Sequence, residues 1–412
     1  MPLFEGIHVS YTGEKTAVVL DIGAAYTKSG FAGENGPRCI LPSELVRPKT
    51  GQLVKIIDFI DKEELYDVLV EYLHKIYFRH LLVNPKDRRV VICESILCQS
   101  SFRDMLARVL FRHYEVPSVL FAPSHQLALL TLAANSGLVI DVGFTESLVL
   151  PIYEGIPVLK AWEAIPLGGK AVQTNLQSQL LEGANVTTQE QGERPLSSVI
   201  SSIEERILED IKVRCCFTTK FDRAEGIHAA RLKESGYGED GATGPKPPPG
   251  VDYPLDGEKM LHIDGKIRES AYEVLFEQDN EERSVATLIL DAIRKCPLDM
   301  RRYLSENIVI IGGTSMAPGF KARLKDELYS LMEKPKYKED LAIQVFKFHK
   351  LPAKENYAAW LGGAIFGALE VLGSRSLTRE QFSSTGRVPD WSSISDDNPK
   401  EEDERLPVPR GR

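Results

Sequence analysis

The chain has 412 residues, 43% apolar and 26% charged, so we expect an ordinary folded protein of two or three domains rather than a disordered or fibrous one. Its 50 Lys and Arg residues stand against 59 Asp and Glu residues, and the net charge of −9 argues against a nucleic-acid partner. The six cysteines form no CxxC pair, the N-terminus lacks a secretory pattern, and no apolar run reaches about 20 residues, which predicts a cytosolic or nuclear protein without membrane insertion.

A strand, an Asp-x-Gly tripeptide and a returning strand occur twice along the chain. The first copy spans 18–20, Asp21-Ile22-Gly23 and 26–31, and the second spans 138–140, Asp141-Val142-Gly143 and 147–153. Each apolar run followed by a tight turn and a second extended run predicts a β-hairpin. Because the copies are equivalent, they predict a pair of pseudo-symmetric domains.

The remaining periodic segments predict strands alternating with helices, as in an α/β fold. Strands are expected at 89–93, 119–121, 308–311 and 343–346. Helices are expected at 65–76, after a capping box formed by Asp61 and Glu64, and at 102–111, 125–134, 173–181, 196–213, 285–294, 319–332 and 357–372.

Two segments lack this pattern. Residues 234–257 are rich in glycine and contain Pro247-Pro248-Pro249, which predicts a loop or an insertion. Residues 383–412 combine serine and proline with an acidic cluster at 401–404, which predicts a solvated, flexible tail, with a docking peptide as the alternative.

The two Asp-x-Gly turns are the first candidates for chemistry. Such a turn places a carboxylate beside backbone N–H groups, which suits a phosphate held through a divalent cation. One copy alone usually marks only a hairpin, whereas two copies facing each other favour a binding site. Asp21 and Asp141 are therefore candidate metal ligands, and Lys28 is placed to reach phosphates as a point charge.

Two glycine pairs follow later in the chain. Gly312-Gly313 joins the strand at 308–311 to a helix, where small residues let the backbone approach a ligand. Gly362-Gly363 lies within an apolar helix, where we expect close helix packing rather than ligand contact.

The order of these segments resembles that of the actin family over about residues 15–375. Within the family, the sequence most resembles that of the divergent actin-related protein at the pointed end of the dynactin filament. The resemblance rests on Asp21-Ile22-Gly23 to Gly33, Asp141-Val142-Gly143, Leu167-Gly168-Gly169-Lys170, Ile311-Gly312-Gly313-Thr314-Ser315-Met316 and Trp360-Leu361-Gly362-Gly363.

The resemblance implies an actin-like α/β fold, with two pseudo-symmetric domains around a nucleotide cleft and a strongly reduced subdomain 2. The small domain is expected to comprise 1–136 and 350–382, with the reduced subdomain 2 at about 44–57. The large domain is expected to comprise 137–349, including the insertion at 234–257, and the acidic tail to comprise 383–412.

The resemblance also implies ATP or ADP with Mg in the cleft, bound as a static, structural nucleotide, with Asp21 and Asp141 at the metal. Around adenosine, Lys212 matches actin, but Val213, Ala317 and Asn356 replace larger or charged residues. The expected nucleotide-binding residues are Asp21, Gly23, Ala24, Ala25, Lys28, Asp141, Gly143, Thr145, Lys212, Gly312, Gly313, Thr314 and Met316.

The departures from actin predict a protein that is not an enzyme. Phe144, Thr145 and Leu148 stand where actins carry an aspartate, a glycine and a histidine. Neither Phe144 nor Leu148 is able to orient or deprotonate a water, so hydrolysis of ATP is expected to be absent or very slow, with no catalytic residue. The actin glutamine that helps to position this water falls near His125 or Gln126.

A second departure predicts the function. In actin a long subdomain ends in a loop that grips the next subunit, but here only about 44–57 remains. We therefore expect a structural subunit of dynactin in the cytoplasm and cytoskeleton, which caps the pointed end of the actin-related filament. Its partners are expected to be the actin-related protein and actin subunits, through the barbed-end face, and other pointed-end subunits that dock cargo adaptors for dynein-driven transport on microtubules. The alternatives are a subunit of a nuclear chromatin-remodelling complex, a small-molecule kinase of the same superfold, or a loop lost without consequence.

Overall fold

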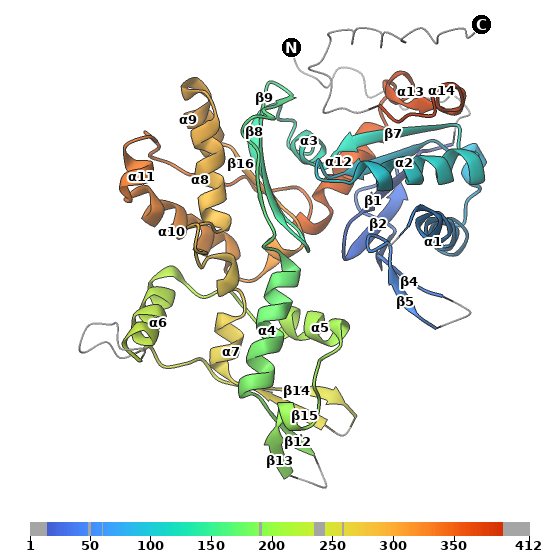
Figure 1. Ribbon diagram of the computed structural model, residues 1–412. Helices are drawn as coiled ribbons and strands as arrows, with labels where there is room; N and C mark the ends of the chain where they lie inside the picture. The colour runs from blue at the N-terminus through green and yellow to red at the C-terminus, as the bar shows by residue number, and fades with distance from the viewer. Residues whose placement is uncertain are drawn as a thin grey trace, which may run out of the picture.

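The protein is seen in a computed structural model that describes residues 15–47, 51–59, 61–188, 192–234, 244–257 and 259–389. We call the part built on the sheet that contains β1 the small domain, and the part built on the sheets that contain β8 and β12 the large domain (Figure 1). The predicted domain boundaries at 136 and 350 stay predictions. Among the residues described, no helix is long and apolar enough to cross a membrane.

The small domain has a mixed sheet in which β1 lies between an antiparallel β2 and a parallel β6. Alternation along β1 directs Val18 and Leu20 to one face and Val19 to the other. The strand order is β17 (Leu377–Thr378), β7 (Ser118–Pro123), β6 (Val90–Glu94), β1 (Val18–Ile22), β2 (Tyr26–Phe31) and β3 (Cys39–Pro42).

Helices cover both faces of this sheet. One face packs on α1 (Lys62–Lys75) and α2 (Ser100–Arg108), and the other packs on α3 (Ser124–Leu130) and α12 (Ala358–Gly367). The Asp61 side chain accepts a 2.6 Å hydrogen bond from the Glu64 N–H, so the predicted N-cap of α1 is confirmed. The helices α1 and α2 each continue into a π-helical turn, at Ile76–Leu81 and Val109–His113.

The large domain contains a sheet equivalent to that of the small domain. The antiparallel pair β8 and β9 is the second predicted hairpin, and β16 lies parallel to β8. The strands are β10 (Ile156–Pro157), β9 (Ser147–Tyr153), β8 (Gly137–Val142), β16 (Ile308–Ile311) and β11 (Glu163–Ile165), which pairs with β9. Its helices are α4 (Gly169–Gly183), α8 (Val285–Lys295), α9 (Leu298–Glu306), α10 (Phe320–Met332) and α11 (Pro335–Lys338).

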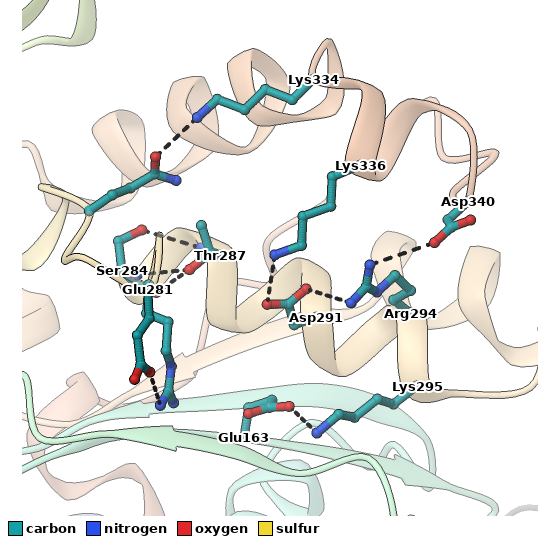
Figure 2. Close-up of polar contacts among 12 residues, drawn as sticks. Glu163, Glu281, Ser284, Thr287, Asp291, Arg294, Lys295, Lys334, Lys336 and Asp340 are labelled. Carbon is teal, nitrogen blue, oxygen red and sulfur yellow. Dashed lines mark hydrogen bonds and ion pairs between the residues drawn. The ribbon is translucent and has the colours of Figure 1, made fainter.

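The helix α8 shows how these elements are fixed at the surface (Figure 2). It begins with a capping box in which the Ser284 N–H donates to Thr287 Oγ1 at 2.7 Å. Asp291 pairs with Lys336 of α11 at 3.5 Å, and Lys295 pairs with Glu163 of β11. The apolar face of α8 is fully buried, while its polar face links a helix and a strand of the same domain.

A second sheet of the large domain was not expected from the sequence. It carries β13 (Gly192–Pro195), β12 (Asn185–Thr188), β15 (Lys259–Ile263) and β14 (Val251–Asp256), and it lies at the lower end in Figure 1, below α5 (Glu205–Cys215), α6 (Phe221–Glu234) and α7 (Gly265–Ser270). All of β14 falls in the segment expected to be a loop, so that expectation was wrong for 251–256. Pro254 is tolerated because β14 is an edge strand.

The segment expected to form the reduced subdomain 2, at about 44–57, contains a small hairpin of β4 (Glu44–Val46) and β5 (Leu53–Lys55). The Ile56 N–H donates to Ser43 O at 3.0 Å and closes its base. Val54 and Ile56 are buried against the small domain. The hairpin is therefore anchored at its root, and residues 48–50 at its turn lie outside the described residues.

Several expected elements differ from those observed. The expected strand at 343–346 is absent, because the Phe346 N–H donates to the Tyr329 hydroxyl at 3.3 Å rather than to a neighbouring strand. The expected helix at 196–213 begins only at Glu205, and Ser198 instead bonds to Pro195 O in a short 3₁₀ turn. The helix expected at 125–134 ends at Leu130, and a left-handed Ala133 follows.

The C-terminal expectations also change. The helix expected at 357–372 ends at Gly367, and a second helix α13 covers Leu372–Arg375. The helix α14 (Arg379–Thr385) extends into the expected tail, and Arg103 donates to Pro389 O at 2.5 Å. The segment up to 389 therefore packs on the small domain, and 390–412 lies outside the described residues.

The two domains share the helix pair α3 and α12. A Cβ atom at Gly362 would lie 1.9 Å from Leu127 O, which confirms that this glycine serves close helix packing. The Trp360 indole N–H donates to Val19 O at 3.1 Å and ties α12 to the small sheet. Leu129 of α3 packs in one cluster with Val139 of β8, so the same pair also contacts the large sheet.

Candidate functional site

A cleft of about 770 Å³ lies between the turn from β1 to β2 and the turn from β8 to β9. It brings together every residue that the sequence predicted for a nucleotide site, from both domains. These are Asp21, Gly23, Ala24, Ala25, Lys28, Asp141, Gly143, Thr145, Lys212, Gly312, Gly313, Thr314 and Met316.

The first turn carries an ion pair. Asp21 and Lys28 face each other across β1 and β2, with Lys28 Nζ 3.1 Å from Asp21 Oδ2. The Gly23 N–H donates to Tyr26 O at 3.2 Å, and the Ser43 hydroxyl donates to Gly23 O at 2.6 Å. The turn is thus closed from within and supported by the residue that precedes the small hairpin.

The second turn is closed in the same way, because the Gly143 N–H donates to Glu146 O at 2.9 Å. Burial raises the pKa of Asp141 to about 6, the charge of Lys28 lowers it, and Asp21 and Glu146 raise it further. The Thr145 hydroxyl donates to Glu146 Oε2 at 2.6 Å, so part of its hydrogen-bonding capacity is used inside the turn.

The segment after β16 approaches the second turn closely. Gly312 has a φ of +94°, and a Cβ atom there would lie 2.3 Å from Val142 O and 2.5 Å from Asp141 Oδ1. The Thr314 hydroxyl donates to Gly143 O at 2.7 Å. Gly312 is therefore required for contact between two protein segments, besides lining the cleft as predicted.

Near the second turn, Lys212 is engaged by a residue that sequence reasoning missed. Lys212 Nζ lies 2.5 Å from Glu209 Oε2, and the Gln173 amide donates to the same oxygen at 2.6 Å. Glu209 and Glu146 both line the cleft. In the sequence, Glu209 and Glu146 are ordinary charged residues within polar segments. Their positions in the cleft follow only from the fold.

Comparison with known proteins assigns the family. The model of the actin family, described as Actin, matches residues 12–388. The chain belongs to the actin family. It is 30% identical to Actin-related protein 10 of Dictyostelium discoideum over 453 aligned positions, covering 93% of this chain and 90% of that protein. It is also 27% identical to Putative actin-29 of the same organism over 401 positions, covering 90% and 95%. The expected actin-like α/β fold is thereby confirmed.

Membership of the actin family makes it possible to ask which residues of the second turn and of α3 face the cleft. Phe144 and Leu148 line the cleft and offer no proton acceptor. Ser124, at the start of α3, also lines the cleft, whereas the Gln126 amide donates to Gly155 O at 2.8 Å, outside the lining. His125 is fully buried. The α3 residue facing the cleft is therefore Ser124, not His125 or Gln126.

The residues present fit a magnesium nucleotide at this actin-family cleft. Two carboxylates, Asp21 and Asp141, supply the oxygen ligands that Mg²⁺ prefers, and Lys28 supplies the charge for phosphate oxygens. The glycine turns leave backbone close to the cleft. Mg²⁺, when bound, would balance the negative charge of the carboxylates and the phosphates, and this chain's residues would only hold and orient the nucleotide.

Proposed function

We propose that this actin-family chain is a non-hydrolysing structural subunit of dynactin, in the cytoplasm and cytoskeleton. In this role it caps the pointed end of the actin-related filament and supports docking of other pointed-end subunits and cargo adaptors for dynein-driven transport on microtubules. The small hairpin of β4 and β5 is the observation that carries the proposal.

The two strands of the hairpin are short. Its strands have three residues each, and its root is tied down by the backbone bond between Ile56 and Ser43. A subunit that has a complete face at one end and lacks a gripping segment at the other is able to join a filament but not to continue it. This asymmetry supports the role of a terminator.

The opposite end of the molecule suits a subunit interface. In Figure 1, the hairpin of β9 and β10 and the helix α9 lie at the end far from β4 and β5. This end exposes Ile156, Leu298 and Tyr303, and Tyr303 packs edge-on against Tyr153. Exposed apolar and aromatic side chains of this kind are typical of interface cores. We assign this end to the actin-related protein and actin subunits.

The cleft supports a static role for nucleotide. Because Phe144 and Leu148 stand where actins carry groups that act on water, a bound ATP or ADP with Mg acts as a brace between the domains, not as a substrate. Such a ligand stabilises the folded protein by mass action.

The deciding experiment is gentle purification of the tagged endogenous protein followed by crosslinking mass spectrometry. We expect dynactin subunits to co-purify, with Lys160 and Lys295 crosslinked to an actin-like neighbour and Lys259, at the other end, not crosslinked to it. Chromatin-remodelling subunits in place of dynactin would reject the proposal in favour of the nuclear alternative. Filament growth from the hairpin end of the protein would reject the capping role.

A further inference from the structure

Two ion pairs connect the small hairpin to the large domain. Glu44 of β4 binds Arg206 of α5, with 2.7 Å between Oε1 and Nη2. Lys55 of β5 binds Glu205 of α5, with 2.6 Å between Nζ and Oε2. Both pairs run between the two domains beside the cleft, where Figure 1 shows β4 and β5 on the side of α5.

The four residues form a matched set. Glu44 and Lys55 are direct partners in the register of β4 and β5, and Glu205 and Arg206 are consecutive at the start of α5. The pairs have opposite polarity. Exchanging the partners would therefore place Lys55 against Arg206 and Glu44 against Glu205, and like charges repel. The arrangement specifies one alignment of the hairpin on α5.

Lys55 also reaches the wall of the cleft. Its Nζ lies 5.6 Å from the centre of the Phe144 ring, in the turn between β8 and β9. The hairpin half of the set is shielded, with side-chain exposures of 16% for Glu44 and 27% for Lys55. The hairpin thus contacts the large domain at both α5 and the second turn.

We propose that the hairpin of β4 and β5 is a strap across the cleft, held by the clasp of Glu44–Arg206 and Lys55–Glu205, so that the protein's own charges keep its two domains closed. The clasp acts with or without nucleotide. The clasp proposal goes beyond the proposed function and does not depend on membership of dynactin. An experiment is therefore able to reject either proposal without rejecting the other.

The strength of the clasp is expected to depend on the salt concentration. Pairs of this exposure are individually weak, and salt screens them. Closing is therefore reversible, and ligand entry requires the strap to open. Raising the salt concentration is expected to open the cleft without unfolding either domain.

Hydrogen exchange of the full chain, measured by mass spectrometry without nucleotide, tests the clasp. The readout is exchange in peptides that cover the first turn at 21–26 and the strap at 51–59. We expect a rise of about threefold for Lys55→Glu and for Glu44→Arg at low salt, and a smaller rise at high salt. The reciprocal variant Glu44→Arg with Arg206→Glu is expected to return to within about twofold of the wild-type rate.

The matched control is Lys295→Glu, which reverses the same charge in a pair with Glu163 inside the large domain (Figure 2). It is expected to leave exchange in both peptides unchanged. If a reversal prevents folding, Lys55→Gln and Glu44→Gln remove the pairs without introducing repulsion. Unchanged exchange in the single variants, failure of the reciprocal variant to restore protection, or an equal rise in Lys295→Glu would each overturn the clasp.

Discussion

The two turns that face each other across the cleft share a backbone but differ in the residue opposite the aspartate. In the first hairpin Asp21 faces Lys28, and in the second hairpin Asp141 faces Leu148. The first aspartate therefore has a counter-charge on its own hairpin, while the second depends on a lysine from the other domain. The repeated Asp-x-Gly hairpin thus supplies an ion pair on the small-domain side of the cleft and an apolar wall on the large-domain side.

This difference separates holding a ligand from transforming it. The polar turn keeps Asp21 and Lys28, which suit a metal-bound phosphate, whereas the other turn offers Phe144 and Leu148, which suit no proton transfer. A protein in which the bound ligand only connects the two domains needs to hold the ligand but not to transform it. The predictions below test whether the two turns are as unequal as this comparison states.

The largest effect is expected at Gly312, which supports the second turn. Gly312→Ala places a methyl group 2.3 Å from Val142 O at a φ of +94°, so we expect a loss of about 3 kcal/mol in the free energy of unfolding. Gly23→Ala in the first turn meets Tyr26 O at 2.9 Å, without a positive φ, and is expected to cost about 1 kcal/mol. Denaturant unfolding of both variants measures the difference, and equal losses would contradict it.

The pH dependence of stability is expected to come from two groups whose pKa is shifted by burial, His125 and Asp141, with opposite signs. Burial lowers the pKa of His125 to about 4, so the unfolded chain binds more protons and stability is lost as pH falls from about 6.5 to 4. This loss reaches about 3 kcal/mol. The raised pKa of Asp141 acts in reverse, because stability falls as pH rises from about 4 to 6.

His125→Gln tests these signs. Compared with the wild type, the variant is expected to lose less stability at acid pH and to show the opposite slope left by Asp141. Thermal unfolding at a series of pH values from 4 to 7 measures both curves. Parallel curves would show that His125 does not control the acid loss.

A third effect, of about 2 kcal/mol, is expected from Lys28→Met, because it leaves Asp21 without its partner and near Asp141. Thr145→Val in the other turn removes one hydroxyl that bonds to Glu146, and a loss of about 1 kcal/mol is expected. MgADP titration is a second readout, in which only Lys28→Met is expected to weaken binding tenfold or more. Similar affinities for the two variants would remove the proposed inequality of the turns.

The smallest effect is expected at Phe144. Phe144→Leu removes the ring beneath Lys55 and keeps an apolar side chain, so a loss of about 0.5 kcal/mol is expected. A double-mutant cycle with Lys55→Met isolates this contact. A coupling energy of zero would show that Phe144 acts only as a wall of the cleft.

The sequence was sufficient for the parts of the fold that depend on local pattern. Apolar runs closed by Asp-x-Gly identified both hairpins, and the same turns placed the predicted residues in one cleft. Capping at Asp61 was also readable, because it depends on residues three apart.

Other parts depended on contacts between distant residues. Tyr329 takes the backbone N–H of Phe346, which no pattern within 343–346 reveals. Glu209 and Glu146 read as solvated charges until the fold places them in the cleft. The residue of α3 that lines the cleft, Ser124 rather than Gln126, likewise depends on how the helix is placed and not on its local pattern.

The contact between Gly362 and Leu127 has a mechanical consequence. Because no side chain separates α12 from α3 at this point, we expect the pair to act as the fulcrum of any rotation of one domain against the other. In Figure 1 this fulcrum lies near the upper end of the molecule, and the hairpin of β4 and β5 lies well below it. A force applied by Glu44 and Lys55 therefore acts through a long lever arm. A contact at that distance opposes opening with a larger torque than a contact of equal strength beside the fulcrum.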